Sequence, residues 1–128
     1  MHGGREILLT DNTKRFFDYW NSLPKVGFVP ERSSFNPPAI HKLMPTVTLL
    51  EIHSRERIEM RLIGTSVARG MGFDPTGRNY LDIIAPETRE AYLLLLKAQI
   101  AQPCGRRSFL RSRNSSGLIA RTEVLALP

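Results

Sequence analysis

The stretch from Arg61 to Asp82, RLIGTSVARGMGFDPTGRNYLD, constrains the fold of this chain more than any other. Glycines stand at positions 64, 70, 72 and 77. Glycine tolerates positive φ and close approach of neighbouring backbone, so several such positions are expected here. Asp74-Pro75-Thr76-Gly77 has the composition of a tight turn, because proline presets φ and glycine accepts the left-handed conformation. The stretch therefore predicts the end of a strand, a short helical turn at 66–70, and a loop that encloses something small.

Regular patterns on either side of this stretch predict an α+β domain. Ile58, Met60 and Leu62 alternate with charged residues, which is typical of a strand with one face in solvent. Pro86 and Glu87 open a longer helix, since proline suits the first position and an acidic group suits the positive end. The expected order is an antiparallel hairpin (47–53 and 57–65), a helical turn (80–84), a helix (86–102) and a second hairpin (106–113 and 118–127) around Asn114–Gly117. We expect an antiparallel sheet with helices packed on one face.

An amphipathic helix is predicted before this core. Thr10 or Asp11 caps it and Pro24 ends it. One face is strongly aromatic, and it carries the candidate interaction residues Phe16, Phe17 and Trp20. This face either docks on the domain's own core or is offered to a second subunit. A proline-rich lead-in follows the helix, so we divide the chain into a lead-in (1–45) and a core (46–128).

Composition limits the class of protein. A chain of 128 residues suits one compact domain. The net charge of +6 permits nucleic acid or an acidic partner, but a solvated basic surface explains it more simply. The one cysteine, Cys104, excludes an internal disulfide and fits a reducing compartment. No segment approaches the about 20 apolar residues that span a bilayer, and residues 1–20 lack a signal-peptide core. We expect a cytoplasmic protein without a membrane segment.

A set of short motifs extends over residues 15–128. They are Tyr19-Trp20, Pro30, Arg32, Phe35, Pro37, Ile40, Met44-Pro45, Arg61–Thr65 and Gly72–Asp82. With the order of elements, they resemble a bacterial family of stand-alone PAS-domain proteins. The resemblance implies a sensory or protein-interaction module of cytoplasmic signalling that acts through an unidentified signalling partner and is not an enzyme. A homo-oligomer is expected.

Cofactor and catalytic motifs are missing from the sequence. His2, His41 and His53 lack the spacing of metal ligands, so no metal site is expected. Gly70 and Gly72 do not continue into a nucleotide-binding GxGxxG pattern. No nucleophile elbow and no paired carboxylates stand out, which leaves no catalytic residue.

The resemblance also argues against the two familiar prosthetic groups. PAS domains that hold haem use a histidine on the long helix before the second hairpin, and no histidine follows Ser54. PAS domains with reactive flavin carry an Asn-Cys-Arg motif, which is absent; Cys104 is expected to be a plain thiol. We therefore expect neither haem nor reactive flavin, and an unknown small ligand remains open.

A PAS fold can enclose a small-molecule cavity between sheet and helices. The apolar candidates for its wall are joined by three polar ones, Arg61, Thr65 and Tyr80, that suit a carboxylate or hydroxyl. The alternative is that these side chains fill the core and no ligand binds. The predicted ligand-binding residues are Leu50, Ile52, Met60, Leu62, Thr65, Val67, Met71, Tyr80, Leu94 and Phe109.

Two functions from different classes follow. The first is a PAS sensor or adaptor that binds a small molecule or a protein partner. The second is a nucleic-acid-binding domain that uses the basic hairpin from Arg106 to Arg121. A stacking platform needs more exposed aromatic rings than Phe109 alone, so we favour the sensor. The basic residues of the alternative are Arg106, Arg107, Arg111, Arg113 and Arg121.

The resemblance raises a question about strand number. A PAS sheet has five strands in the order 2-1-5-4-3, and four are expected here after the first helix. An empty slot exposes strand edges that seek partners. We expect first that the natural chain continues beyond Pro128. The other candidates are insertion of Glu6–Thr10 as a strand, or a strand from a second molecule.

Overall fold

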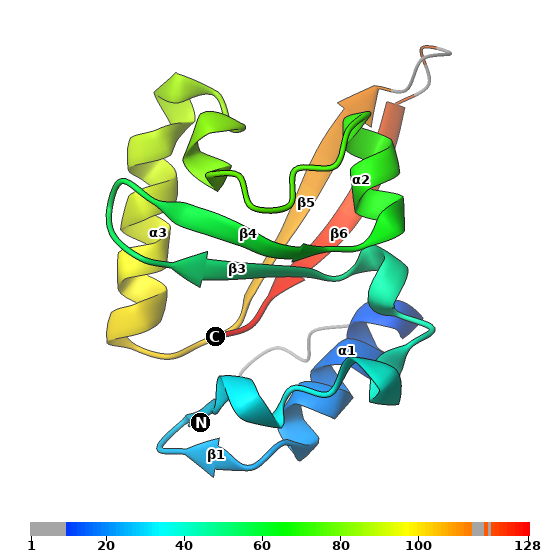
Figure 1. The fold of residues 1–128 in the computed structure, drawn as a ribbon, viewed down its shortest axis with the longest axis vertical. Coiled ribbons are helices and arrows are strands. Elements are labelled where there is room, and N and C mark those ends of the chain that lie inside the picture. The colour runs from blue at the N-terminus through cyan, green and yellow to red at the C-terminus, as the bar shows by residue number, and fades with distance from the viewer. Residues whose placement is uncertain (1–9, 114–116, 118) are drawn as a thin grey trace, which may run out of the picture. The chain divides into compact units, whose positions relative to one another are not determined.

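The structure is a computed structural model that describes residues 10–113, 117 and 119–128 (Figure 1). The chain forms two compact units. The terminal unit contains the chain up to Phe35 together with Pro103–Pro128, and the central unit contains Asn36–Gln102. The predicted division at residue 45 stays a prediction.

The central unit contains the hairpin and helices that the sequence predicted. Both predicted strands and all three predicted helical segments of this region (66–70, 80–84 and 86–102) are confirmed, with ends that shift by a few residues. Its elements are η2 (Pro37–Ile40), η3 (Met44–Thr46), β3 (Thr48–Ile52), β4 (Ile58–Ile63), α2 (Thr65–Met71), η4 (Tyr80–Asp82), η5 (Pro86–Thr88) and α3 (Arg89–Ala101).

The terminal unit contains the predicted N-terminal helix and the second hairpin. The sequence analysis missed one small hairpin, β1–β2, and treated its residues as irregular. Its turn is Gly27-Phe28, with Gly27 at φ 67°, a conformation that suits glycine. The elements are α1 (Asp11–Ser22), β1 (Lys25–Val26), β2 (Val29–Pro30), η1 (Arg32–Ser34), β5 (Arg106–Arg113) and β6 (Ile119–Ala126).

The described strands pair as three separate two-stranded antiparallel sheets, β1–β2, β3–β4 and β5–β6. The α+β class with antiparallel pairing is confirmed. Residues 6–9 of the suggested additional strand lie outside the described residues, and Thr10 is the N-cap of α1. The predicted turn at Asn114–Gly117 is described only at Gly117.

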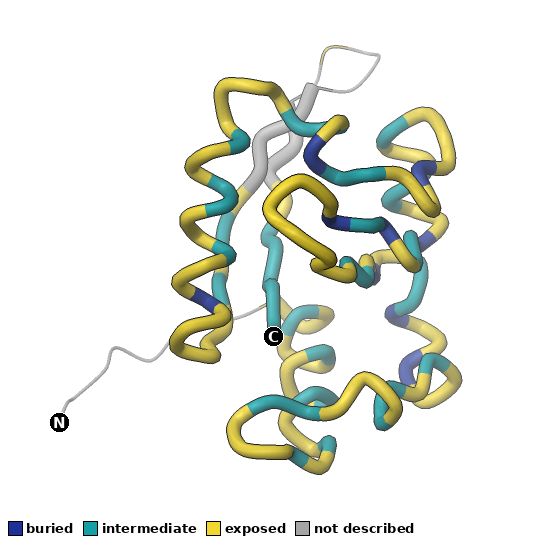
Figure 2. Tube along the Cα trace, turned by 60° about the vertical axis from the view of Figure 1, so that its left-hand side comes forward, coloured by how far each residue is buried: buried dark blue, intermediate teal, exposed yellow. Residues whose placement is uncertain are grey.

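The buried apolar side chains of the described residues lie in the central unit (Figure 2). Alternation along β4 explains part of this core, because Ile58 and Met60 point inward while Arg61 is exposed. Ile58 is 0% exposed. Burial of each such side chain contributes about 1.5–3 kcal/mol, so this cluster stabilises the unit. Its members are Ile40, Leu43, Val47, Ile58, Met60 and Leu81.

The loop between α2 and η4 packs along the edge of β4. The Gly77 N–H donates to the Met60 carbonyl at 2.8 Å, and the Met60 N–H donates to the Arg78 carbonyl at 2.9 Å. Asp74 Oδ1 shapes the turn by accepting from the Thr76 N–H at 3.0 Å. Gly77 has a φ of 84°, as the turn sequence predicted. The sequence predicted a loop that encloses something small. The structure shows that this loop pairs with the backbone of β4.

Asn79 joins this loop to the β3–β4 hairpin. Its Oδ1 accepts from the Ile58 N–H at 3.0 Å and from the Leu81 N–H at 3.2 Å. Its Nδ2 donates to the Glu56 carbonyl at 2.7 Å. One side chain therefore satisfies three backbone groups from three segments, which fixes the hairpin, the loop and η4 together.

Gly64 is required by close packing rather than by its dihedral angles. A Cβ there would lie 2.2 Å from the Pro45 carbonyl oxygen. The Gly64 N–H also donates to the Val47 carbonyl at 2.8 Å. Gly70, by contrast, lies within α2 with open space around it, so only part of the glycine pattern is structurally required.

Candidate functional site

A groove in the central unit lies between α3 and the end of the β3–β4 hairpin. Its volume is about 470 Å³. Figure 1 shows α3 beside the turn that joins β3 to β4. We call this site the α3 groove. It is lined by Ile52, Ser54, Arg55, Glu90, Leu93, Leu94, Leu96, Lys97, Ile100 and Ala101.

One stripe of α3 forms the helical wall of the groove. Positions 90, 93, 94, 97, 100 and 101 recur at the spacing of one helix face. Leu94 is 65% exposed and Ile100 is 61% exposed, so the floor is apolar and open to solvent. From the hairpin, Ile52 adds a side chain that is 45% exposed. These exposed positions leave this stripe of α3 accessible to solvent.

Contacts with η4 hold α3 in place within the central unit. The rings of Tyr80 and Tyr92 lie 5.1 Å apart between centroids. The Arg89 guanidinium lies 3.9 Å from a carboxylate oxygen of Asp82. Both contacts leave from positions outside the groove stripe, so they fix the helix without filling the groove.

Two cations border the groove without a charged partner. Arg55 comes from the hairpin turn and Lys97 from the middle of α3. Among the residues that the structure describes, neither side chain forms an ion pair or a hydrogen bond. Glu90, at the other end of the stripe, is unpaired on the same criterion. The groove thus combines an apolar floor with uncompensated charge.

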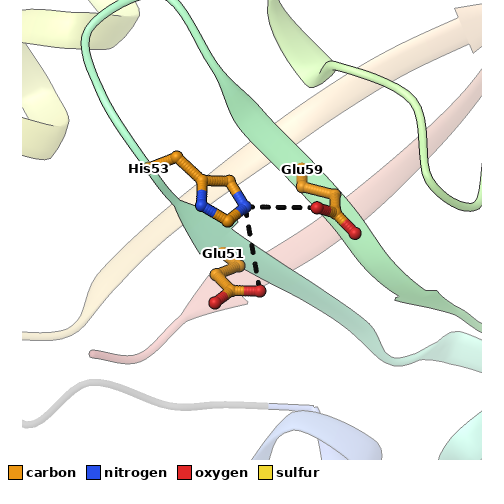
Figure 3. Close-up of side chains that lie close together, drawn as sticks. All are labelled: Glu51, His53 and Glu59. Carbon is orange, nitrogen blue, oxygen red and sulfur yellow. Dashed lines mark hydrogen bonds and ion pairs between the residues drawn. The ribbon is translucent and has the colours of Figure 1, made fainter.

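A second concentration of polar groups lies on the solvent-facing side of the β3–β4 hairpin. His53 Nε2 is 3.1 Å from Glu59 Oε1 and 3.8 Å from Glu51 Oε2 (Figure 3). One donor atom from each of these residues lies within 4.8 Å of the others. Imidazole and carboxylate are ligands that divalent transition metals accept, so the set has the chemistry of a metal site. We call Glu51, His53, Glu59 and the adjoining Arg57 and Arg61 the hairpin cluster.

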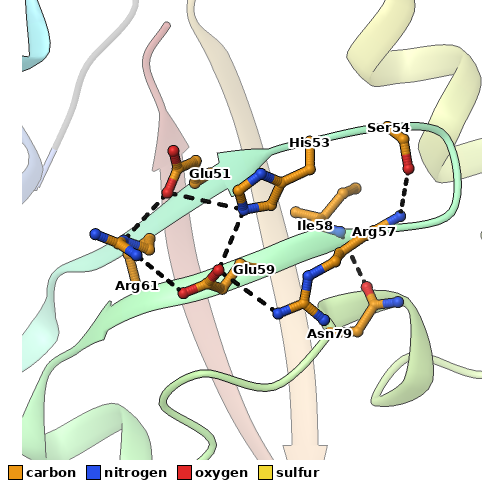
Figure 4. A network of polar contacts seen from close by, with 8 residues as sticks. All are labelled: Glu51, His53, Ser54, Arg57, Ile58, Glu59, Arg61 and Asn79. Carbon is orange, nitrogen blue, oxygen red and sulfur yellow. Dashed lines mark hydrogen bonds and ion pairs between the residues drawn. The ribbon is translucent and has the colours of Figure 1, made fainter.

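Two guanidinium groups already neutralise the carboxylates of the hairpin cluster (Figure 4). Arg61 lies 3.1 Å from Glu51 and 3.2 Å from Glu59, and Arg57 lies 3.5 Å from Glu59. The hydrogen bond from Arg61 lowers the pKa of Glu59, with smaller help from His53 and Arg57 and against the effect of burial. A metal ion would compete with two cations for the same oxygens. The geometry therefore favours an ion-pair network over a metal centre.

The sequence-based prediction tested the histidines for metal-ligand spacing and found no paired carboxylates, so it missed this network. The signal was available: His53 comes two residues after Glu51, directly beyond the end of β3, and Glu59 is the cross-strand partner of Glu51. The expectation of no metal site stays a prediction.

The structure separates the predicted ligand-binding residues. Ile52 and Leu94 line the α3 groove, whereas Met60 is buried in the core. Thr65 is exposed at the first position of α2, and Phe109 belongs to the terminal unit. The partly buried members are Leu50, Leu62, Val67, Met71 and Tyr80. Their role as ligand contacts stays a prediction.

The polar candidates have other contacts in the structure. Arg61 is engaged in the hairpin cluster and Tyr80 packs against Tyr92. Sequence reasoning missed eight groove residues: six on α3 were signalled by the stripe of apolar and charged positions on the predicted helix, and two in the hairpin turn had no such signal. Those residues are Ser54, Arg55, Glu90, Leu93, Leu96, Lys97, Ile100 and Ala101.

The aromatic face of α1 makes contacts within the terminal unit. Trp20 Nε1 donates to the Pro128 carbonyl at 2.9 Å, and the Trp20 ring stacks on Phe17 with centroids 6.4 Å apart. Phe17 is 37% exposed and Phe16 is partly buried. Trp20 thus takes part in intramolecular packing. A subunit contact through these three residues stays a prediction.

Glu123 of β6 fixes the start of α1. Its carboxylate accepts hydrogen bonds from Thr10 and from the Thr13 hydroxyl, and it pairs with Arg107 at 2.8 Å. The Glu123 side chain is only 4% exposed. The hydrogen bond from Thr13, with help from Arg107 and Thr10, lowers the pKa of Glu123 to about 2 although burial opposes it. Arg107 is therefore a structural residue of this unit.

A comparison with protein families agrees with this architecture. A family model described as a PAS domain matches residues 9–128. The chain belongs to the PAS-domain family. This places it in a class of signalling sensory modules. Searches of curated proteins and of solved structures found no match.

The PAS assignment clarifies the central motif. Gly64, Gly77 and Asn79 of this PAS domain hold backbone segments together. The motif that carries the resemblance is therefore chiefly structural, and the α3 groove lies outside it. Within the described part of the chain, each helix is too short or too polar to cross a lipid bilayer.

Proposed function

We propose that this PAS domain is a cytoplasmic, non-catalytic sensory module that binds a small molecule in the α3 groove and signals through a protein partner. The observation that carries the proposal is the groove itself. Its volume of about 470 Å³ falls within the roughly 300–1,000 Å³ of small-molecule sites. Its lining is mainly apolar with a few polar groups, as in such sites.

Exposed apolar side chains of the groove provide the driving force for ligand binding. Leu94, Ile100 and Ile52 expose surface that a bound molecule removes from water. A ligand would contact both the hairpin and α3, which are distant in sequence. It would therefore favour the conformations in which these two elements keep this spacing, and such a change of population is a means of signalling to a partner.

Native mass spectrometry of the purified protein tests this proposal. We expect a small molecule to co-purify or to be retained after incubation with a metabolite extract. Leu94→Asp places a charge on the groove floor at an exposed position, so it should abolish retention and leave the fold intact. Retention by the variant equal to that of the original protein, or no retention by either, would contradict the proposal.

The nucleic-acid alternative gains no support from the described side chains. Arg107 pairs with Glu123 and stacks over Phe109 at 4.7 Å from the ring centroid. The side chains of Arg111, Arg113 and Arg121 lie outside the described residues. DNA binding that weakens steeply with salt would revive this alternative.

A further inference from the structure

We propose that the ligand of the α3 groove is an amphipathic carboxylate: an apolar chain that lies on the leucine stripe, with its anionic group against Arg55 and Lys97. This inference rests on the proposed function and gives the chemical class of the ligand. The evidence for it is the charged residues that border the groove. The proposed function rests instead on the volume and apolar lining of the groove.

The charges of the groove differ from the other charges of the hairpin. Arg57 and Arg61 each have a carboxylate partner within 4.0 Å, whereas Arg55, two positions before Arg57, has none among the described residues. Lys97 is also unpaired there. A neutral ligand that covered these cations would remove water from them without replacing its interactions. A carboxylate supplies the missing partner.

The position of Glu90 orients the ligand. Seven residues separate Glu90 from Lys97 on α3, which is about 10 Å along the helix axis. A carboxylate is repelled by Glu90 and attracted by Lys97, so it lies toward the Lys97 end. Leu93 and Leu94 occupy the stripe between these two charges and contact the chain of the ligand.

A series of probes that differ only in the head group tests the charge. Decanoate, decanol and decyltrimethylammonium, each below its micelle concentration, are titrated into the protein by calorimetry. We expect decanoate to bind about tenfold more tightly than decanol, and the cation to bind most weakly. Each methylene removed from the carboxylate should weaken binding about fourfold.

Matched variants identify the residues responsible. Arg55→Met and Lys97→Met should each weaken decanoate binding about three- to tenfold and leave decanol binding unchanged, since the apolar stem is kept. Glu90→Gln should strengthen decanoate binding about threefold. Lys42→Met is the control, because Lys42 is exposed in the same unit and does not line the groove.

The outcomes separate this inference from the function on which it rests. Decanol and decanoate binding equally, with both sensitive to Leu94→Asp, would retain the groove function and overturn the carboxylate. Failure of every probe to bind would overturn the amphipathic carboxylate, and the groove function would then stand or fall on the native mass spectrometry described above. If a variant does not fold by circular dichroism, the comparison of head groups on the unchanged protein decides the question.

Discussion

The hairpin cluster and the α3 groove both use the β3–β4 hairpin, yet they are opposite in character. In the hairpin cluster, each carboxylate meets a guanidinium within 4.0 Å, and His53 lies between them. The α3 groove is lined by Arg55 and Lys97 together with apolar side chains, and neither cation has a counter-charge among the described residues. The first arrangement pairs its own charges, and the second is the site that we propose for a ligand. A charged side chain is informative about function when its partner is missing.

Apolar side chains of the central unit show a similar contrast, between the buried core and the exposed groove floor. Substitution in the core gives the largest expected change in the free energy of unfolding. Met60→Ala should lower the free energy of unfolding by about 2–5 kcal/mol, because Met60 is 4% exposed and truncation leaves a cavity. Leu94→Ala should change it by less than about 0.5 kcal/mol, because Leu94 is 65% exposed. Urea denaturation measures both. Equal losses would show that Leu94 belongs to the core and that the groove is closed.

Substitution of Asn79 gives the next largest expected loss of stability. Asn79→Ala removes three hydrogen bonds to backbone groups and should cost about 2–3 kcal/mol in urea denaturation. Asn79→Asp is the matched control, since it keeps the acceptor for Ile58 and Leu81 and replaces the donor to the Glu56 carbonyl by a carboxylate oxygen. It should lose less stability. An equal loss of stability in both variants would mean that the hydrogen bond from Asn79 Nδ2 to the Glu56 carbonyl supplies most of the stabilisation.

Acid should undo the terminal unit through Glu123. The pKa of Glu123 is lowered to about 2 in the folded protein from an ordinary value of 4.5. Its stabilisation is therefore complete above pH 4.5 and is lost as the pH falls toward 2. Fluorescence of Trp20, the one tryptophan, should report this loss. Glu123→Gln should remove this part of the pH dependence; an unchanged pH profile would assign it to other groups.

The smallest effect is expected from the exposed hairpin cluster. Arg57 is 50% exposed as a side chain, and its pair with Glu59 spans 3.5 Å. Surface ion pairs contribute little, so Arg57→Met should lower the melting temperature by no more than about 2 °C. Addition of salt should reduce the difference further. A large loss would mean that the cluster, and not the adjoining Asn79 network, holds the hairpin.

The sequence predicted the elements of the fold better than the site. Alternation along Ile58–Ile63 and the proline and acidic residues before α3 are local signals. They depend only on neighbouring residues in the sequence, so they can be read without knowing the tertiary structure. Lys25 shows what is harder to foresee. Its ammonium group donates to the carbonyls of Trp20, Asn21 and Leu23 at the end of α1, which depends on the path of the chain from α1 into β1.

The site depended on which elements meet. The predicted wall residues were chosen for apolar character, and that property does not distinguish Met60 in the core from Leu94 on the surface. Arg61 illustrates the same limit: Glu59 lies two residues before it on β4, but its other carboxylate partner, Glu51, lies on β3 and is brought near only by the pairing of the two strands. The pairing state of a charge is a tertiary property.

Titration of decanoate into isotopically labelled protein, followed by amide chemical shifts, tests the central claim most directly. The account predicts shifts concentrated at the hairpin turn around Arg55 and along Glu90–Ala101, with saturation at one ligand per chain. Glu51, Glu59 and the loop at Asp74–Asn79 should change little. Shifts spread over the hairpin cluster and the core, or no saturable shifts at all, would contradict the claim that the α3 groove is the ligand site.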